Sequence, residues 1–459
     1  MLWLLIGVIW GNKINISHTD SLSYMPTLAV KGNKIAVAWT ERHEFQRNFD
    51  IYYIESEDKG AHWSDIMKIA GEADASINGL PCVVIDCTDV VHVVWSKNYV
   101  DLYWTYQCGD TWATPVNISP NCPGEETWHD VIVDKQNRIW VFWQTYGYDG
   151  QCRYTVYDGI SWSEPVNFTH QPGGCGAPRV ALDTAGNLHV VWSNSTDGYN
   201  FHIYYKKYNG IEWSEAEEVP CVEDLDWACD VKIDVDRTGK VWIIWVYNER
   251  PYCAYRDTEG WVGPFLVVNE KIIDPDFVID DNGGLHLCWV GIDCVGRISY
   301  VYYSESTDTV WSSPLQISDS IAWGVSMAVD HEGYLYIVWS QRIWGRSPPD
   351  CNYDIYFLKG HLTGIEEMFT PNSNEGNLLL LNSSKPVINF RLNNPDRVMM
   401  YIYNVAGQIM QQIDFGYKSS DITYAFTITP DMFRESGVYF YYIRTPHETV
   451  AKGKLIVIR

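Results

Sequence analysis

The sequence has few basic residues and no long apolar segment. Of its 459 residues, 33 are Lys or Arg and 58 are Asp or Glu, giving a formal net charge of −25. Proteins that bind nucleic acids or anionic lipids neutralise phosphates with basic side chains, so this charge argues against both functions. The apolar run at residues 1–11 is too short to cross a bilayer as a helix, and no later stretch is long and apolar enough. We therefore expect no transmembrane helix in the mature chain.

Familiar catalytic and metal-binding motifs are also missing. The chain contains no H-E-x-x-H, Walker A or G-x-S-x-G motif and no pair of cysteines with zinc-site spacing. His92, His189 and His286 lie at equivalent places in alternate repeats of the pattern described below. A repeat architecture would hold them far apart, so we interpret them as packing residues. We predict neither a bound metal nor a cofactor.

Aromatic residues and cysteines are abundant but unevenly distributed. Hydrophobic residues make up 46% of the chain, with 22 Trp and 31 Tyr, which is enough to build a core. No Trp follows Trp344 and no Cys follows Cys351, and the acidic excess also ends near residue 365. We therefore predict a main domain over residues 12–365, a linker over 366–376 and a second domain over 377–459.

Residues 1–11, MLWLLIGVIWG, suit the apolar core of a secretory signal, with Gly11 as a small residue at a possible cleavage position. The alternative is a buried first strand. We favour the signal, because twelve cysteines and many aromatic residues fit a chain outside the cytoplasm.

A repeat with nearly constant spacing organises residues 12–365. Each repeat contains an apolar segment such as VHVVWS or LYIVWS that ends near a tryptophan. These tryptophans are Trp39, Trp95, Trp143, Trp192, Trp245, Trp289 and Trp339. An aspartate lies nine residues before each except the first: Asp86, Asp134, Asp183, Asp236, Asp280 and Asp330. Asp followed by Gly or Asn favours a tight turn, so each repeat predicts two strands joined by a turn.

A tyrosine-rich strand, a second Trp and a short fourth strand follow in most repeats. Four short strands in fewer than 60 residues are typical of a propeller blade. The last repeat lacks its fourth strand, but residues 13–17, KINIS, match the strands that end the other repeats. We predict an all-β chain with a seven-bladed β-propeller closed by this N-terminal strand. An open β-solenoid is the alternative.

One turn carries a motif of a known family. Ser56, Asp58, Gly60 and Trp63 fit the pattern S-x-D-x-G-x-x-W. This resembles the Asp box of sialidase-like propellers with BNR repeats. The resemblance covers roughly residues 12–365 and implies a structural role for the box, with Asp accepting backbone hydrogen bonds and Trp packing between sheets.

The predicted blade topology also gives a place for ligands, on the face that carries the variable loops and the links between blades. Sialidases use an arginine triad, a Tyr–Glu pair and an acidic Asp, and their early Arg lies in a Tyr-Arg-Ile-Pro motif. Here the corresponding residues, 24–27, are Tyr-Met-Pro-Thr. Candidates for a catalytic role are Arg179, Arg250, Arg342, Asp274 and Asp276.

Aromatic and polar residues enter the innermost strands on this face. A sugar ring stacks well on an aromatic plane, and nearby polar side chains can hold its hydroxyls. The predicted ligand-binding residues are Trp128, His129, Arg179, Trp227, Asp230 and Trp323. The alternative is that these tryptophans pack between blades.

Three pairs of cysteines are close in sequence and could form disulfides: Cys82 with Cys87, Cys221 with Cys229, and Cys288 with Cys294. The alternative is that they are buried free thiols.

Residues 377–459 alternate in the manner of strands and predict a small immunoglobulin-like β-sandwich. The residues Tyr403-Asn404-Val405-Ala406-Gly407-Gln408 and the end Lys454-Leu455-Ile456-Val457-Ile458-Arg459 resemble C-terminal sorting domains of type IX secretion substrates. The resemblance implies export through secretion machinery. An ordinary accessory domain is the alternative.

We predict a secreted or surface-attached propeller that binds glycan, or a protein, on its loop face. The first alternative is a glycoside hydrolase or lyase of sialidase-like fold. The second is a structural surface module without a small ligand.

Overall fold

The structure is a computed structural model of the whole chain. It describes residues 7–19, 21–42, 49–71, 77–122, 124–146, 150–170, 174–195, 201–221, 230–292, 298–306, 309, 311–343, 352–363, 376–381, 387–392, 394–404, 409–420, 422–429, 432–433, 437–445 and 449–457. These residues form β-strands joined by turns and loops, and no α-helix occurs among them. Within the same residues, no helix offers the length and apolarity that a bilayer crossing would need.

The chain divides into two compact units. One consists of Trp10–His361, and the other of Met1–Ile9 together with Leu362–Arg459. The strands up to the unit boundary are β1 (Gly7–Trp10), β2 (Ile14–Asn15), β3 (Leu22–Lys31), β4 (Lys34–Arg42), β5 (Phe49–Ser56), β6 (Met67–Ala70), β7 (Asn78–Ile85), β8 (Val91–Lys97), β9 (Asp101–Cys108), β10 (Thr111–Trp112), β11 (Val116–Asn117), β12 (Glu125–Val133), β13 (Ile139–Tyr146), β14 (Cys152–Tyr157), β15 (Val166–Asn167), β16 (Gly174–Leu182), β17 (Leu188–Ser195), β18 (His202–Tyr208), β19 (Glu217–Glu218), β20 (Val231–Val235), β21 (Val241–Tyr247), β22 (Arg250–Arg256), β23 (Trp261–Leu266), β24 (Ile272–Ile279), β25 (Leu285–Ile292), β26 (Ile298–Ser306), β27 (Leu315–Gln316), β28 (Ala322–Val329), β29 (Tyr334–Arg342) and β30 (Tyr353–Thr363).

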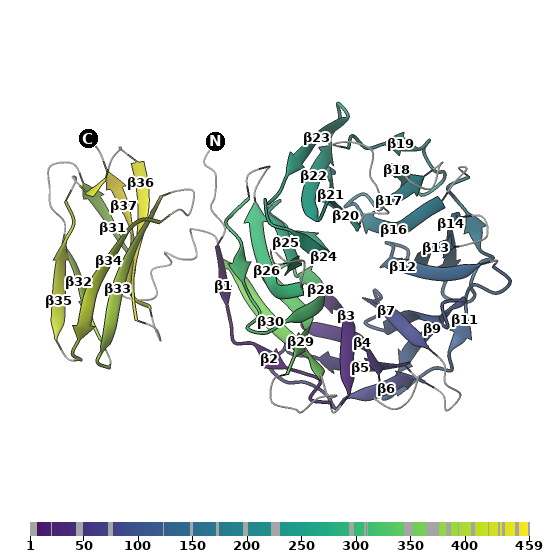
Figure 1. Cartoon of the computed structure of the whole chain (residues 1–459), viewed down its shortest axis with the longest axis horizontal. Coiled ribbons are helices and arrows are strands. Elements are labelled where there is room, and N and C mark those ends of the chain that lie inside the picture. Colours follow the sequence, from purple (N-terminus) through teal and green to yellow (C-terminus); the bar gives the residue numbers. More distant parts are fainter. Residues whose placement is uncertain are drawn as a thin grey trace. The chain divides into compact units, whose positions relative to one another are not determined.

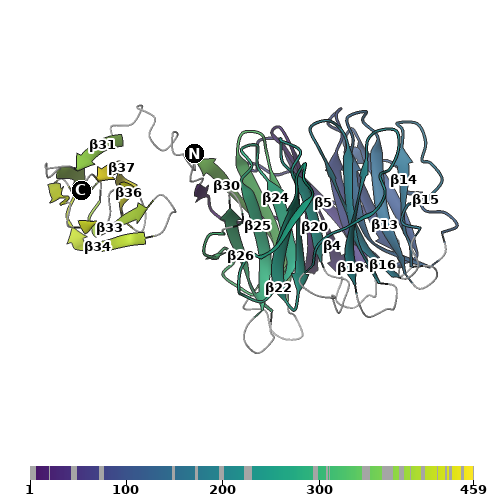
Figure 2. The ribbon, with the colours of Figure 1, turned by 90° about the horizontal axis from the view of Figure 1, so that it is seen from above.

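These strands form antiparallel sheets arranged in a ring (Figure 1). Four of the sheets have four strands each in chain order: β12 to β15, β16 to β19, β20 to β23 and β24 to β27. The innermost strands are β3, β7, β12, β16, β20, β24 and β28. Each contacts the next, and β28 contacts β3, so the ring is closed as in a β-propeller. Figure 2 shows the same sheets side by side from above.

The N-terminal residues complete the sheet that ends the ring. Strand β2 pairs antiparallel with β30, with Ile14 opposite Phe357, and the Ile355 N–H donates to Ser17 Oγ at 2.8 Å. The resemblance of residues 13–17 to the outer strands of other repeats predicted this pairing. Gly7–Trp10, within the segment predicted as a signal, form strand β1, which also pairs with β30. For these four residues the structure therefore has the strand of the alternative interpretation.

The aspartates that precede the blade tryptophans organise the turns as the sequence predicts. Asp183 is typical, because its Oδ1 accepts the N–H groups of Ala185 at 2.9 Å and Asn187 at 2.8 Å. Asp86, Asp134, Asp236, Asp280 and Asp330 accept the equivalent two bonds. A local side-chain bond of this kind fixes the turn independently of the rest of the fold.

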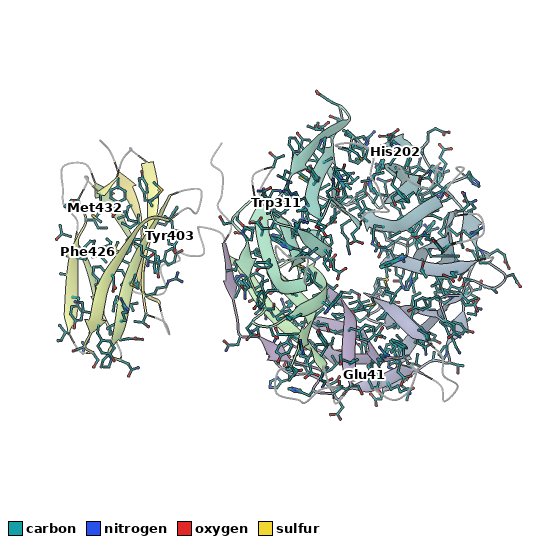
Figure 3. The ribbon with its side chains drawn as sticks, viewed as in Figure 1. Glu41, His202, Trp311, Tyr403, Phe426 and Met432 are labelled. Carbon is teal, nitrogen blue, oxygen red and sulfur yellow. A yellow bond between two sulfur atoms is a disulfide. The ribbon has the colours of Figure 1, made fainter. Side chains whose placement is uncertain are left out.

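Tryptophans fill the space between neighbouring sheets. The blade tryptophans are fully buried, and each repeats the same position in its sheet. Second tryptophans such as Trp311, labelled in Figure 3, pack against clusters that draw on two neighbouring sheets, here the cluster that includes Trp242 of β21 and Trp289 of β25. In the Asp box, Asp58 Oδ1 accepts the His62 N–H at 2.7 Å, the Gly60 N–H donates to Ser56 Oγ at 2.8 Å, and Trp63 packs edge-on against Phe357. The box therefore has the geometry expected of a structural turn.

One cysteine prediction is wrong. Cys82 and Cys87 are both free, so they do not form a disulfide with each other. The disulfide in the described residues joins Cys152 to Cys175, which bridges strands β14 and β16 of neighbouring sheets. Cys221 and Cys288 are free thiols, and their suggested partners, Cys229 and Cys294, lie outside the described residues. Sequence proximity failed here because the pairing depends on which strands the ring brings together.

The second unit has two sheets around its own apolar core. Its strands are β31 (Gly376–Leu381), β32 (Val387–Arg391), β33 (Asp396–Asn404), β34 (Ile409–Lys418), β35 (Thr423–Thr427), β36 (Gly437–Arg444) and β37 (Thr449–Val457). The larger sheet has the order β31-β37-β36-β33-β34, and β32 pairs with β35. Buried Ile388, Met400 and Tyr441 belong to one cluster that both sheets contribute to. The linker predicted over residues 366–376 lies almost wholly outside the described residues.

Candidate functional site

A cavity of about 510 Å³ lies where the innermost strands begin. Its lining comes from β3, β7, β12, β16, β20, β24 and β28, with contributions from β29 and β30. The two tryptophans in this lining, Trp128 and Trp323, are 47% and 42% exposed, unlike the buried blade tryptophans. The cavity is therefore a site in which aromatic surface is available to a ligand.

A bulge near the start of the innermost strands shapes this cavity. In β12 the pairing with β13 shifts between Thr127 and Asp130, and in β24 it shifts between Ile273 and Asp276. Equivalent shifts occur in β3, β7, β16 and β28. Residues at these bulges adopt positive φ angles: Met25 at 54°, Leu80 at 55°, Trp128 at 50°, Asp274 at 46° and Gly324 at 51°. A bulge re-aims the side chains that follow it, here at the start of each innermost strand.

The positive φ angles single out two of these positions. Glycine adopts such angles without strain, and Gly324 is present at one bulge. Trp128 and Asp274 hold the same conformation at a cost of order 1 kcal/mol each. The sequence therefore keeps an indole and a carboxyl group in the cavity where glycine would fit the backbone better.

Two residues beyond the bulge, the strands present a ring of side chains that we call the inner ring. It consists of Thr27, Cys82, Asp130, Arg179, Lys232, Asp276 and Ser326, each paired with the residue that precedes a blade tryptophan. Members of the inner ring tie neighbouring strands together, since Asp130 Oδ2 accepts the Val180 N–H at 2.9 Å and Asp276 Oδ2 accepts the Met327 N–H at 2.7 Å.

The two cations of the inner ring lie beside carboxylates of the same ring. Lys232 Nζ is 3.0 Å from Asp276 Oδ1. Burial raises the pKa of Asp130, although the nearby charge of Arg179 and the Val180 N–H act in the opposite direction. Lys232 is thus paired within the ring, and the charge of Arg179 acts on Asp130.

Asp230 and Asp274, two residues before Lys232 and Asp276, also line the cavity. Burial, followed by the charge of Asp230, raises the pKa of Asp274, while the Gly324 N–H and Lys232 oppose this shift. Among the residues that the structure describes, no ion pair joins Asp230 or Asp274 to a Lys or Arg. We call these two carboxyl groups, which line one cavity and of which Asp230 acts through its charge on Asp274, the acidic pair.

His129 contributes a neutral imidazole. Its side chain is almost completely buried, and its Nε2 lies 3.2 Å from the Val94 carbonyl oxygen, which can accept but not donate. Burial lowers the pKa of His129 to about 4, so at neutral pH Nε2 carries the proton and Nδ1 is an acceptor. Within the described residues Nδ1 is buried and has no hydrogen-bond partner.

The structure brings most of the residues predicted from the sequence into this one cavity. Its lining includes Trp128, His129, Arg179, Asp230, Asp274, Asp276 and Trp323. Arg250, exposed at the start of β22, and Arg342, at the end of β29, are not part of the lining. Trp227 lies outside the described residues. Arg179 is the arginine of the described lining, so these residues do not form an arginine triad.

Lys232 was missed by the sequence analysis, as were Leu80, Pro81 and Tyr353. A usable signal was present, because in four repeats the residue immediately before the inner-ring residue is a proline: Pro26, Pro81, Pro178 and Pro275. Proline has no N–H to lose at a bulge and therefore marks this position in the repeats. Aligning the repeats on these prolines would have placed Lys232 beside Arg179 and Asp276.

Clusters of three or more His, Cys, Asp or Glu side chains suited to a metal ion do not occur in the described part of the chain. The repeat histidines instead form buried networks. His189 Nδ1 lies 2.7 Å from Tyr205 Oη, and its Nε2 lies 3.1 Å from Asp183 Oδ2.

Comparison with solved structures places the ring in a known architecture. A structure described as a new family of polysaccharide lyase, PL25 ulvan lyase, matches with a TM-score of 0.52 at 13% identity over 77% of this chain and 96% of that chain. The likeness is one of fold. A protein of unknown function from Dyadobacter fermentans matches with a TM-score of 0.50 at 10% identity over 78% of this chain and its whole length. The NanB sialidase from Streptococcus pneumoniae matches with a TM-score of 0.46 at 10% identity, over 66% and 70% of the two chains.

No protein-family model and no curated protein sequence matches the chain. Identities this low relate the folds and not the activities, so the chemistry of this chain has to be argued from its own cavity.

Proposed function

We propose that this protein binds glycan in the central cavity. The observation that carries the proposal is the pair of half-exposed tryptophans, Trp128 and Trp323, in the lining of one cavity. Sugar rings present an apolar face that stacks on an indole, and their hydroxyls need polar partners nearby. Asp230 and Asp274 line the same cavity as the two indoles and supply acceptors.

The fold supports a glycan-related function. Its structural neighbours include a polysaccharide lyase, and one of that lyase's structures is described as bound to a saccharide of GlcA and Rha3S. The low identity means that neither the substrate nor the chemistry can be carried over residue by residue. A protein partner on the same loop face is the other ligand class for a propeller.

The test uses the purified full chain on a diverse glycan array, with the mass of the retained glycan measured at each spot. We expect retention without a mass change, weakened at least about tenfold by Trp128→Ala and by Trp323→Ala, because stacking of one sugar ring is lost. Tyr146→Ala is the matched control, since Tyr146 is an exposed aromatic residue outside the cavity lining. If no glycan is retained, or if all three variants bind alike, the proposal is wrong.

A second candidate is a glycoside hydrolase or lyase that uses the acidic pair. The specific observation is that Asp230 and Asp274 line one cavity and that burial, followed by the charge of Asp230, raises the pKa of Asp274, because a carboxyl group with a raised pKa is suited to act as an acid beside a second carboxyl group. A change in glycan mass on any spot of the array that is lost in Asp274→Asn would favour this candidate over simple binding.

We further infer that the ring is a seven-bladed propeller and that the second unit is an immunoglobulin-like sorting domain of a secreted or surface-attached protein. The support comes from the seven sequence repeats, from the motif around Tyr403 and Asn404, and from a disulfide, which is typical of oxidising compartments. The test is to express the full chain and a form ending at Leu362 in a bacterium with type IX secretion. Export of the full chain alone is expected, and equal export of both would contradict the sorting role.

A further inference from the structure

The second tryptophans of the repeats pack in one way. Each contacts the tyrosine-rich strand of the repeat before it in the ring. Trp112 meets Tyr53 edge-on, with 4.9 Å between ring centroids and an interplanar angle of 78°, and Trp261 meets Tyr205 at 5.4 Å and 83°. The same contact joins Trp63 to Phe357, Trp162 to Trp104 and Trp213 to Tyr154. The last repeat has no tryptophan after its own tyrosine-rich strand, β30.

Trp10, at the end of β1, makes this contact for the last repeat. Its ring lies edge-on to that of Tyr303, with 4.9 Å between centroids and an interplanar angle of 82°. Tyr303 directly follows Tyr302, the residue that pairs with the blade tryptophan Trp289. Tyr53 has the same place in β5. Trp10 therefore occupies the position of a second tryptophan, although it comes from the opposite end of the segment that forms the ring.

The backbone after Trp10 repeats the pattern of the other blades. The residue that follows each second tryptophan donates its N–H to the tyrosine-rich strand of the same repeat, and here Gly11 donates to the Lys359 carbonyl at 2.8 Å. Six residues after the tryptophan, an apolar residue donates to the same strand, and here Ile16 donates to the Ile355 carbonyl at 2.8 Å. The residues equivalent to Ile16 are Ile118, Phe168, Val219, Val267 and Ile317.

This register gives the small residue at position 11 a structural reason. A Cβ atom on Gly11 would lie 3.2 Å from the Lys359 carbonyl oxygen, which is a tight contact. The equivalent residues are also small: Ser64, Ala113, Ser163, Ser214 and Ser312. Close approach to the neighbouring strand therefore accounts for Gly11 without a protease.

We propose that residues 10–16 are the last part of the seventh repeat and stay in the mature protein, with Trp10 as its second tryptophan. The two ends of the ring segment then meet in the turn that carries the Asp box in the first repeat. The cleavage position expected at Gly11 is not used, and processing of the N-terminus is confined to residues before Trp10. This inference concerns maturation and does not depend on the ligand in the cavity.

Two truncated forms of the chain isolate the contribution of Trp10. One begins at Trp10 and the other at Asn12, each after a start methionine, and both keep β2. We expect the ring of the form that begins at Asn12 to melt at least about 5 °C lower, because the aromatic contact and the Gly11 hydrogen bond are lost. Equal melting temperatures for the two forms would overturn the proposal.

Substitutions in the full chain test the equivalence of the repeats. Trp10→Ala should lower the melting temperature of the ring about as much as Trp112→Ala does, and Trp10→Phe should recover part of the loss. Ile14→Ala is the control in the same segment, since Ile14 is 39% exposed, and we expect a change within about 1 °C. An effect of Trp10→Ala no larger than that of Ile14→Ala would contradict the assignment.

A double-mutant cycle keeps the test informative if alanine at position 10 prevents folding. Trp10→Phe and Tyr303→Leu should together lower the free energy of unfolding by less than the sum of their separate effects, because each removes the same contact. Strictly additive effects would contradict the contact.

The mature N-terminus decides the processing step directly. The full chain is produced in a bacterium with type IX secretion, and its N-terminal peptide is identified by mass spectrometry. We expect the peptide to begin at Trp10 or at an earlier residue. An N-terminus at Asn12 or later would overturn the proposal.

Discussion

Asp183 shows how one side chain can fix a turn and a buried network together. Its Oδ1 accepts two backbone N–H groups, while Oδ2 accepts from Asn187 at 2.6 Å and contacts His189. Burial alone would raise the pKa of Asp183, but the hydrogen bonds from Asn187 and the partnership with His189 outweigh it and lower the pKa to about 2. The charged form is therefore the form that the fold stabilises.

Replacing this aspartate should destabilise the protein in a pH-dependent way. Asp183→Ala is expected to lower the free energy of unfolding by about 2–3 kcal/mol at pH 7, because bonds to a charged acceptor are lost. The folded pKa lies below the unfolded value of about 3.9, so this stability is present above pH 4 and is lost as the pH falls toward 2. Urea unfolding at pH 7 and at pH 3 measures the difference. An equal effect at both values would contradict the charge argument.

At the scale of the element, the two-residue strand β2 completes the sheet that ends the ring. It pairs with β30, which comes from the other end of the chain segment that forms the ring. Ile16, next to β2, is buried, and the Asn15 side-chain N–H donates to Asp354 Oδ2 at 2.7 Å. Without these residues, β30 would present an unpaired edge to solvent. Such edges pair readily with other chains.

Removal of residues 1–17 should therefore weaken the ring and promote association. We expect the free energy of unfolding to fall by about 3 kcal/mol or more, since a buried isoleucine and several hydrogen bonds are lost. Chemical unfolding and light scattering after size exclusion measure both effects. Removal of residues 1–6 is the control, and equal stability and mass for the two truncated forms would show that β2 does not close the ring.

At the scale of the whole molecule, each unit has a core of its own. Met400 is buried in the cluster of the second unit, and Met327 is buried in the ring. Among the described residues, the cluster around Met400 is built from the second unit alone and the cluster around Trp289 from the ring alone, so the two units are expected to unfold as separate cooperative transitions.

Calorimetry of the full chain tests this independence. Met400→Ala is expected to lower the midpoint of one transition, by an amount that corresponds to about 2–5 kcal/mol, and to leave the other in place. Met327→Ala is the reciprocal variant and should move only the second transition. A single transition that both substitutions lower would indicate that the units unfold together.

The strand repeat, the turns and most of the cavity residues could be predicted from the sequence. The turns follow from local chemistry, because an aspartate bonds the backbone two and four residues ahead of it. The constant spacing of these turns places equivalent residues at equivalent heights, which is why Trp128, Asp230 and Asp274 could be grouped before their positions were known. Arg250 on β22 and Arg342 on β29 lie at strand ends outside the cavity lining, and neither belongs to an innermost strand.

Only the tertiary structure decided which residues of different sheets pair with each other. Lys232 is ion-paired with Asp276, and Cys152 is bonded to Cys175, because closing the ring sets neighbouring strands at a fixed height and angle. The bulges that open the cavity likewise depend on the register between two strands. Periodicity along the chain records which residues are equivalent, whereas contacts across the ring depend on rotations between sheets that no local pattern encodes.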